Sequence, residues 1–353
     1  MKMTLAFCIS FVLATLLFSA IYSFDHAHKI HRRVDRAILY LQWFHQAQFA
    51  GFYVANNKGF YDDVDLEVDI RPRPLTAGED WSVPRIVSAS TDRDDKPKAF
   101  GIWVGDQVLR QYAEENLQIA AIGTVFDRSL ACFMVKDQSN IFGPHDFGDK
   151  RVGLFKGYDT EIIYNWLVAH YPPPTPAHTV LLNPTADATA QLRSGDVDVW
   201  PAYAINEPLA AEAAHPPLHV RLIFPDYYNI GYYSDTLIVN RRTLERHRDV
   251  VERFTEASER GWRYALENRD EAVKIVVGYD RLRLGRLIEQ QQLMLNKMTF
   301  YVRTFNPMLG MDEPTWASMA DILQQQGALK DVGIYKTLCD FNLAKDAHKL
   351  HRE

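Results

Sequence analysis

The segment at residues 37–70 constrains the fold of this chain more than any other segment. Residues 37–41 form a short apolar run with the character of a strand. Beyond a polar loop, aromatic side chains follow the helical i, i+3, i+4 spacing: Phe49, Phe52, Tyr53 and Phe60. Gly59 supplies a helix C-cap, and residues 65–70 then alternate acidic and apolar side chains as a half-buried strand does. The order strand, loop, helix, strand predicts an open α/β sheet.

The loop of this unit, residues 42–48, is rich in aromatic and amide side chains. Ligands of open α/β sheets bind at loops that follow the carboxyl ends of strands. Aromatic rings stack on a flat ligand ring, and amides hydrogen-bond to its edge. We therefore expect Trp43, Gln46 and Phe49 to contact a ligand, with His45 as a further candidate. The alternative is a purely structural unit, which the helical spacing favours for three of the aromatic residues: Phe52, Tyr53 and Phe60.

The chain has 353 residues, which is enough for one or two domains with ample cores. Its composition, 47% hydrophobic and 24% charged, is that of an ordinary globular protein. The formal net charge of −6 argues against a nucleic-acid partner, because such proteins present a basic face.

The first residues differ from the rest of the chain. Lys2 is followed by an apolar run without charge until Asp25, which is typical of an export signal. The run is also long enough to span a bilayer as an uncleaved anchor. We expect residues 1–23 to be a signal peptide or an N-terminal membrane anchor, and the protein to be periplasmic.

Two cysteines follow this segment, Cys132 and Cys339. They lie far apart in the sequence, so pairing and free thiols both remain open. Neither has a neighbour at CxxC spacing, and we expect no metal site.

Strand and helix patterns recur in two sets along the remaining chain. The first set occupies residues 36–127 and resumes at 235–345, where a helical C-terminal tail follows. Residues 128–234 form a second set inserted into the first. Two crossings, near 127–134 and 225–240, connect the sets and provide the hinge that closure of two lobes around a ligand requires.

Four sequence blocks resemble the solute-binding proteins of the NMT1/THI5-like (SsuA/THI5) family of ABC importers. The blocks read LQWFHQAQFAGFYVANNKGFYDDVDLEVDI, AFGIWVGDQVL, RVGLFKGYDTEIIYNWL and SGDVDVWPAYAINEP. The resemblance covers roughly residues 36–330 and implies a type II periplasmic-binding-protein fold, in which two α/β lobes are joined by a two-strand hinge. It also implies that the partners are a small solute and the permease and ATPase of an importer. A monomer without a cofactor is expected.

Within these blocks, several residues lie at expected strand ends and are candidates for ligand contact. Trp103 pairs with Trp43 as a second stacking ring, with core packing as the alternative for both, and Asp106 accepts from a ligand amine or caps its helix. A helix beginning at Gly157, Tyr158, Asp159 and Thr160 offers free N–H groups to an anion, although the Asp159 carboxylate would compete for them. The remaining candidates follow a later strand, with core packing and capping as their alternatives: Tyr203, Asn206 and Glu207.

The chain also departs from the family pattern. Family members that synthesise a pyrimidine carry a cysteine-rich cluster, which this sequence lacks, and its first loop reads FHQAQFA where the thiamine-binding branch has a different motif. We expect no catalytic residues. The expected ligand is an aromatic or heterocyclic solute, such as a thiamine-pyrimidine precursor or a riboflavin-like molecule. A pyrimidine synthase and a ligand-sensing partner of a membrane signalling protein are the alternatives.

Overall fold

The structure is a computed structural model that describes residues 34–76, 81–183, 186–281, 288–302 and 307–350. The segment predicted to be a signal or anchor, residues 1–23, lies outside the described residues. Within the described ranges, no helix has both the length and the apolar character needed to cross a membrane.

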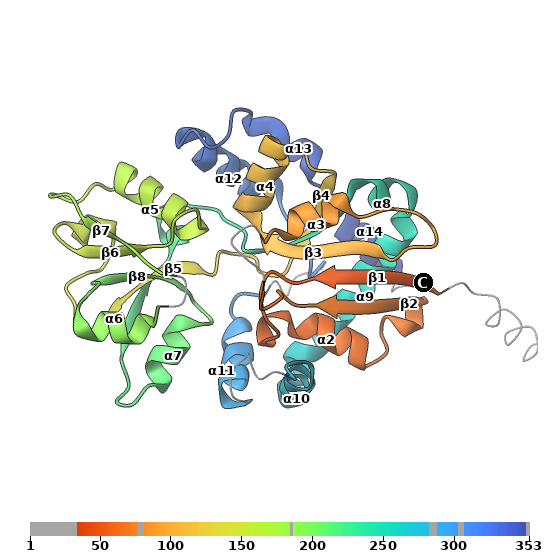
Figure 1. The fold of residues 1–353 in the computed structure, drawn as a ribbon, viewed down its shortest axis with the longest axis horizontal. Helices are drawn as coiled ribbons and strands as arrows, with labels where there is room; N and C mark the ends of the chain where they lie inside the picture. Colours follow the sequence, from red (N-terminus) through yellow and green to blue (C-terminus); the bar gives the residue numbers. More distant parts are fainter. Residues whose placement is uncertain (1–33, 77–80, 184–185, 282–287, 303–306, 351–353) are drawn as a thin grey trace, which may run out of the picture. The chain divides into compact units, whose positions relative to one another are not determined.

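The first sheet has five strands in the order β2-β1-β3-β10-β4 (Figure 1). Their bounds are Asp35–Tyr40 (β1), Leu66–Arg71 (β2), Lys98–Val104 (β3), Ile119–Thr124 (β4) and Asp235–Asn240 (β10). Strands β1 and β3 are parallel, whereas β10 is antiparallel to both of its neighbours. The last strand of this sheet therefore comes from a part of the chain more than 100 residues beyond β4, and it lies between β3 and β4.

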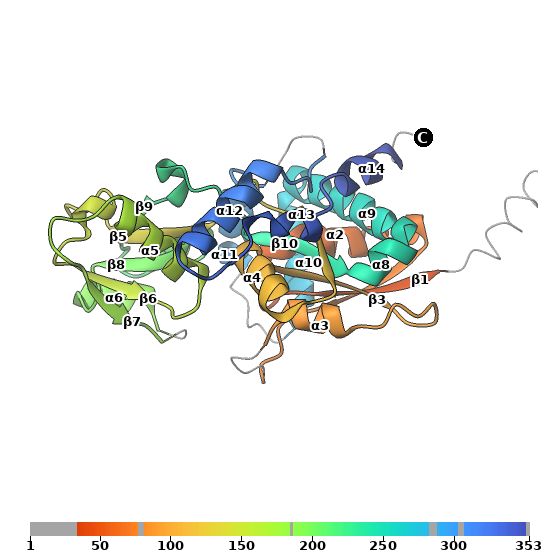
Figure 2. The same ribbon diagram turned by 90° about the horizontal axis from the view of Figure 1, so that it is seen from above.

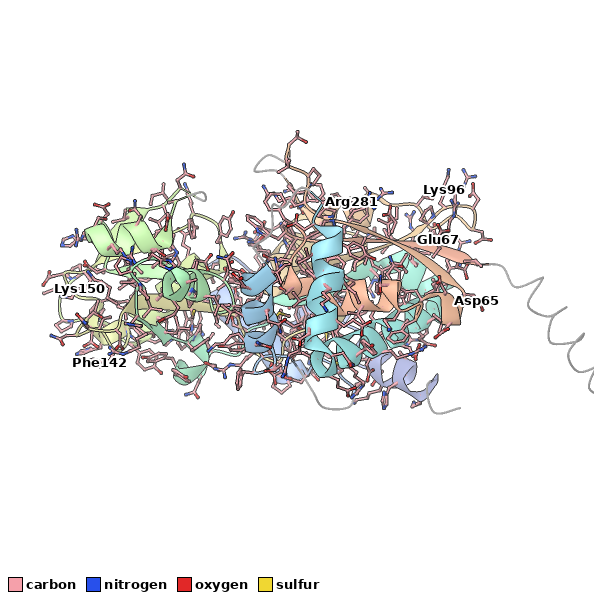
Figure 3. The ribbon with its side chains drawn as sticks, turned by 90° about the horizontal axis from the view of Figure 1, so that it is seen from below. Asp65, Glu67, Lys96, Phe142, Lys150 and Arg281 are labelled. Atoms are coloured by element: carbon pink, nitrogen blue, oxygen red, sulfur yellow. The ribbon has the colours of Figure 1, made fainter. Side chains whose placement is uncertain are left out.

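The opening segment forms the predicted unit. Strand β1 leads into η1 (Ala47–Phe49), α2 (Ala50–Asn57) and then η2 (Asp62–Val64) before β2. Gly59 has a φ of 74°, the left-handed conformation expected of a residue after a helix end. In β2, buried and exposed residues alternate, and Figure 3 labels one of the exposed ones, Glu67. The prediction of a half-buried strand is confirmed.

Helices cover both faces of the first sheet. Successive residues of β3 enter opposite clusters: Phe100 and Ile102 pack with the residues of α2 and α9, while Ala99 and Trp103 pack with those of α3 and α4. Figure 2 shows α3 and α9 on opposite sides of β1 and β3. The helices attached to this sheet are α3 (Val83–Ala89), α4 (Gly105–Glu115), α8 (Arg241–Arg246), α9 (Arg248–Glu267) and α10 (Arg269–Tyr279).

The second sheet has the order β7-β6-β8-β5-β9. Its strands are β5 (Ala131–Lys136), β6 (Arg151–Leu154), β7 (His178–Leu181), β8 (Val199–Tyr203) and β9 (Val220–Ile223). Strand β6 is parallel to β7 and β8, and β5 is antiparallel to β8 and β9. Its helices are α5 (Asp159–His170), α6 (Ala188–Ser194) and α7 (Glu207–Ala213), with η3 (Pro144–Phe147) before β6. In Figure 1, α5 and α6 lie on opposite sides of this sheet.

The chain passes between the two sheets twice, at residues 125–130 and 224–234. The second crossing contains η4 (Pro225–Tyr228). The Ser234 hydroxyl accepts a hydrogen bond from the Leu130 amide at 2.9 Å, so the two crossings are tied to each other.

The C-terminal region is helical, as the sequence pattern predicts. It comprises α11 (Ile288–Met298), α12 (Glu313–Gln325), η5 (Val332–Ile334), α13 (Tyr335–Leu338) and α14 (Leu343–Leu350). Helix α11 contacts α7, and α12 contacts α5. The Gln326 amide, just after α12, donates to the carbonyl of Ile162 at 2.8 Å. This region therefore packs against both sheets. Cys132 and Cys339 are both free thiols.

Two glycines allow α2 and α9 to approach closely. A Cβ atom on Gly261 would meet the carbonyl oxygen of Gly51 and would lie 2.7 Å from the Cβ of Ala55. Because backbone atoms cannot move aside as a flexible side chain does, we predict that Gly261→Ala lowers the free energy of unfolding by about 1–3 kcal/mol. Urea denaturation measures this loss.

The matched control is Gly278→Ala on α10, an exposed helical position where a Cβ would have nothing within 4 Å. Alanine there should leave stability unchanged or raise it by roughly 0.5–1 kcal/mol, since glycine is a poor helix former. Equal effects of the two substitutions would contradict the close-approach explanation.

Candidate functional site

Three buried aspartates lie where strands of the two sheets end. Asp106 is in the first turn of α4, directly after β3. Asp235 begins β10 and pairs with Val104, the last residue of β3, so it lies at the same edge of the sheet. Asp159 begins α5, just beyond β6 of the other sheet. Their exposed fractions are 0%, 0% and 3%, respectively, which is unusual for aspartate.

Asp106 and Asp159 carry carboxylate oxygens that lack hydrogen-bond partners. Among the described residues, no donor meets hydrogen-bond geometry at either oxygen of Asp106 or at Oδ2 of Asp159. Burial raises the pKa of Asp106, against the opposing influence of the nearby Tyr232 hydroxyl and Arg110 guanidinium. Burial, and then the charge of Asp106, raises the pKa of Asp159 to about 7. The two carboxyl groups are therefore electrostatic neighbours, although they belong to different sheets.

Asp235 has partners. The amides of Gln42 and Gln48 donate to its carboxylate at 2.6 and 2.9 Å. Burial nevertheless raises its pKa to about 7, since these two neutral donors only partly offset the loss of water. The Gln46 side-chain amide does not hydrogen-bond to Asp235 in this network; it donates to the side-chain oxygen Oε1 of Gln48 at 2.5 Å. The loop that sequence analysis singled out thus reaches the acidic site through Gln42 and Gln48.

Three hydroxyl groups complete the polar lining. The hydroxyl oxygens of Thr160, Tyr203 and Tyr232 are buried without a hydrogen-bond partner. Burial and then Asp159 raise the pKa of Tyr203, and burial and then Asp106 raise the pKa of Tyr232. These tyrosines are therefore close to the two acids. Buried polar groups in native proteins are almost always hydrogen-bonded, so this collection of polar groups is the candidate site of the chain.

The amino end of α5 is already occupied by the chain's own acids. The Gly157 amide donates to Glu161 at 2.6 Å, and the Thr160 amide donates to Asp159 at 2.8 Å. These are the donors that sequence analysis offers to an anionic ligand. Gly157 has a φ of 82°, and Tyr158 beside it is largely exposed.

The aromatic candidates differ in how much ring surface they expose. Phe49 is fully buried in the core beside α2. Trp103 is also buried, because the alternation along β3 directs it toward α4, and its indole N–H donates to Gln107 at 3.1 Å. Trp43 is 40% exposed, with the Arg73 guanidinium 5.6 Å from its ring centre. Of the two expected stacking rings, Trp43 has the free ring surface.

Asn206 and Glu207 hydrogen-bond to each other at the start of α7, and the Asn206 side chain makes no capping hydrogen bond to that helix. Glu207 accepts from the Tyr203 backbone amide at 2.8 Å and from the Asn206 side-chain amide at 2.5 Å. The pair thereby shapes the turn from β8 into α7 and positions Tyr203.

His45 and Gln291 hold the first loop in place. The His45 Nδ1 lies 2.9 Å from the Tyr53 hydroxyl, and the Ala47 amide donates to Gln291 at 2.7 Å. Burial lowers the pKa of His45, which keeps the ring neutral. Over the ranges that the structure describes, no three His, Cys, Asp or Glu side chains are grouped as a metal site.

The protein has the periplasmic-binding-protein fold. Two α/β lobes are joined by two crossings, and polar groups lie at the strand ends. Solved structures with this architecture include the aliphatic sulphonate binding protein SsuA from Escherichia coli, with a TM-score of 0.62 and 14% identity over 86% of this chain and 91% of that one. The desulfurization enzyme DSZB also shares it, with a TM-score of 0.58 and 14% identity over 90% of this chain and 100% of that one.

The family is shown by the sequence comparison. The NMT1/THI5 like model matches residues 46–272, and the chain belongs to this family. A curated relative is the riboflavin-binding protein RibY of Chloroflexus aurantiacus, which is 23% identical over 309 residues, 84% of this chain and 82% of the relative. The resemblance stated from the sequence blocks is confirmed at the level of family and fold.

Proposed function

We propose that this protein is the extracytoplasmic solute-binding protein of an ABC importer. Its solute is a small aromatic or heterocyclic molecule, held between a lobe of residues 36–127 and 235–345 and a lobe of residues 128–234. The observation that carries the proposal is the set of buried, unpartnered oxygens on Asp106, Asp159, Tyr203 and Tyr232, which come from both sheets. A solute that satisfies them is bound by both lobes at once.

Lobe closure is the proposed mechanism. The two crossings supply the hinge, and the Gln107 amide, which donates to the Gly157 carbonyl at 3.4 Å, is a direct contact between the lobes. Such closure needs no covalent chemistry, because the solute is only enclosed and then passed to the permease and ATPase. SsuA and RibY, whose names describe solute binding, support this function over the alternatives.

A thermal-shift screen of pyrimidine precursors of thiamine, flavins and nucleobases tests the proposal. At least one solute should raise the melting temperature in a saturable manner, because binding to the folded state alone stabilises it. A folded protein that no solute stabilises, and that retains no small molecule on purification, would contradict it.

The state of Cys132 bears on the enzymatic alternative. This thiol is fully buried, and burial, followed by the charges of Glu207 and Asp159, raises its pKa well above the usual range. The thiolate is the nucleophilic form, so a cysteine in this environment is inert. The thiol nearest the site is therefore unsuited to covalent catalysis.

We predict that Cys132 reacts with Ellman's reagent only after the protein unfolds, and that Cys132→Ser keeps solute binding. A background with both Cys8→Ser and Cys339→Ser isolates the Cys132 signal, since these are the other two cysteines of the sequence. Rapid labelling of the native protein that solute suppresses would instead indicate an accessible thiol at the site and favour an enzyme.

A further inference from the structure

The polar groups of the site limit the chemical class of the solute more narrowly than the protein's family membership does. Among the described residues, three carboxylate oxygens of Asp106 and Asp159 have no hydrogen-bond donor. Two hydroxyls lie beside them, and their residues, Thr160 and Tyr232, are 5% and 1% exposed. The Thr160 hydroxyl has no partner, and the Tyr232 hydroxyl interacts with Asp106 without reaching full hydrogen-bond geometry. A buried carboxylate without donors is costly, so a ligand that fits here supplies donors and positive charge.

The surrounding groups do not neutralise this charge. Arg110 is the cation that lowers the pKa of Asp106, but it does not hydrogen-bond to either oxygen. The other charged or titratable groups acting on the acids or their neighbours are mostly acidic or neutral: Asp235, Glu207, Tyr203, Tyr232, Cys132 and, from α11, Lys297. The amides at the start of α5 are taken by Asp159 and Glu161. At pH values where the two acids are ionised, an anionic solute would meet like charges here and few free donors.

We propose that the solute presents a cationic or amino-substituted nitrogen, with adjacent N–H donors, to Asp106 and Asp159. This inference rests on the proposed function and narrows it. It separates this protein from a binder of sulfonates, phosphates or carboxylates, whose site requires donors where this chain has acceptors.

Proton release follows from the state of the acids without ligand. Burial and the charge of Asp106 raise the pKa of Asp159 to about 7, so near neutral pH this carboxyl retains part of a proton that aspartate in water has lost. Burial shifts the pKa of Asp106 in the same direction. A cation favours the ionised pair and displaces this proton. Affinity for a cation must then rise as the pH increases from about 5 to about 8, whereas affinity for an anion must fall.

Three probes that share one ring test the proposal: benzamidine, a cation with paired N–H donors, benzamide, which is neutral, and benzenesulfonate, an anion. Each is titrated into the full chain at pH 5.5 and pH 8 and followed by thermal shift and saturation-transfer NMR. We expect benzamidine to bind at least tenfold more tightly than the other two at pH 8, and its advantage to shrink at pH 5.5.

Variants locate the site. Asp106→Asn and Asp159→Asn, checked for folding by circular dichroism, should each abolish the preference for benzamidine. Glu114→Gln removes one charge from the exposed end of the same helix as Asp106 and should preserve the preference.

The possible failures are distinguishable. Tighter binding of benzenesulfonate, or binding favoured by low pH, overturns the inference and leaves a solute-binding protein in place. Benzamidine that binds no better than benzamide also overturns it. If none of the probes binds and no small molecule co-purifies, the proposed function fails as well.

Discussion

Asp159→Asn should stabilise the ligand-free protein at pH 8 and change its stability little at pH 4. In the folded chain the pKa of Asp159 is raised to about 7, mainly by burial and then by Asp106, against about 4 when unfolded. The folded state therefore holds a proton that the unfolded state loses between those values. The stability associated with that proton is complete below about pH 4 and is lost as the pH rises to 7 and above.

The size of the expected gain in stability follows from the pKa shift of Asp159. One pKa unit corresponds to about 1.4 kcal/mol, so ionising Asp159 in the folded state costs up to about 4 kcal/mol, part of which is shared with Asp106. Asparagine avoids this cost and keeps the native geometry, because Oδ1 still accepts from the Thr160 amide while the unpartnered Oδ2 position becomes an NH₂ group. We expect a gain of about 2–4 kcal/mol at pH 8 in urea denaturation.

Asp198 provides a control of opposite sign. The Arg151 guanidinium binds it at 3.1 Å and lowers its pKa despite partial burial. Asp198→Asn should therefore destabilise the protein, and more at pH 8 than at pH 4. Destabilisation by Asp159→Asn at pH 8, or an equal effect at both pH values, would contradict this account. Either result would show that other groups of the chain stabilise the ionised Asp159 carboxylate.

The second large effect concerns affinity. Asp106→Asn should weaken binding of the solute that the wild-type protein retains by roughly 10- to 150-fold, because a hydrogen bond to a charged group contributes about 1.5–3 kcal/mol. Gln46→Ala should have a smaller effect, since Gln46 donates to Gln48 and not to an acid. Isothermal titration calorimetry measures both.

Glu114→Gln again serves as the unaffected control for this series. Equal losses in Asp106→Asn and Gln46→Ala would indicate that the first loop, and not the acid pair, carries the solute. In that case Trp43, with its exposed ring, would become the first residue to examine.

Local patterns in the sequence predict much of this architecture. The alternation at β2 and the helical spacing after Phe49 depend on neighbouring residues, and both appear as expected. Sequence patterns also place Asp106 and Asp159 at boundaries between a strand and a helix, and both residues lie in the first turn of a helix.

Other site residues depend on contacts between distant segments. Asp235 meets Gln42 and Gln48 across 193 and 187 residues, because β10 enters the sheet between β3 and β4. Nothing in the sequence near residue 235 indicates this register. The sequence leaves stacking and core packing both open for Trp103 for a related reason. Strand β3 is apolar on both faces, so its sequence does not reveal which side chains point toward which helices.

Native mass spectrometry of the wild-type protein, purified and sprayed at pH 8, tests the central claim most directly. We predict one small molecule per chain, basic in character, which is lost in both Asp106→Asn and Asp159→Asn and retained in Glu114→Gln. A solute that both aspartate variants hold as firmly as the wild type does would contradict binding at these carboxylates.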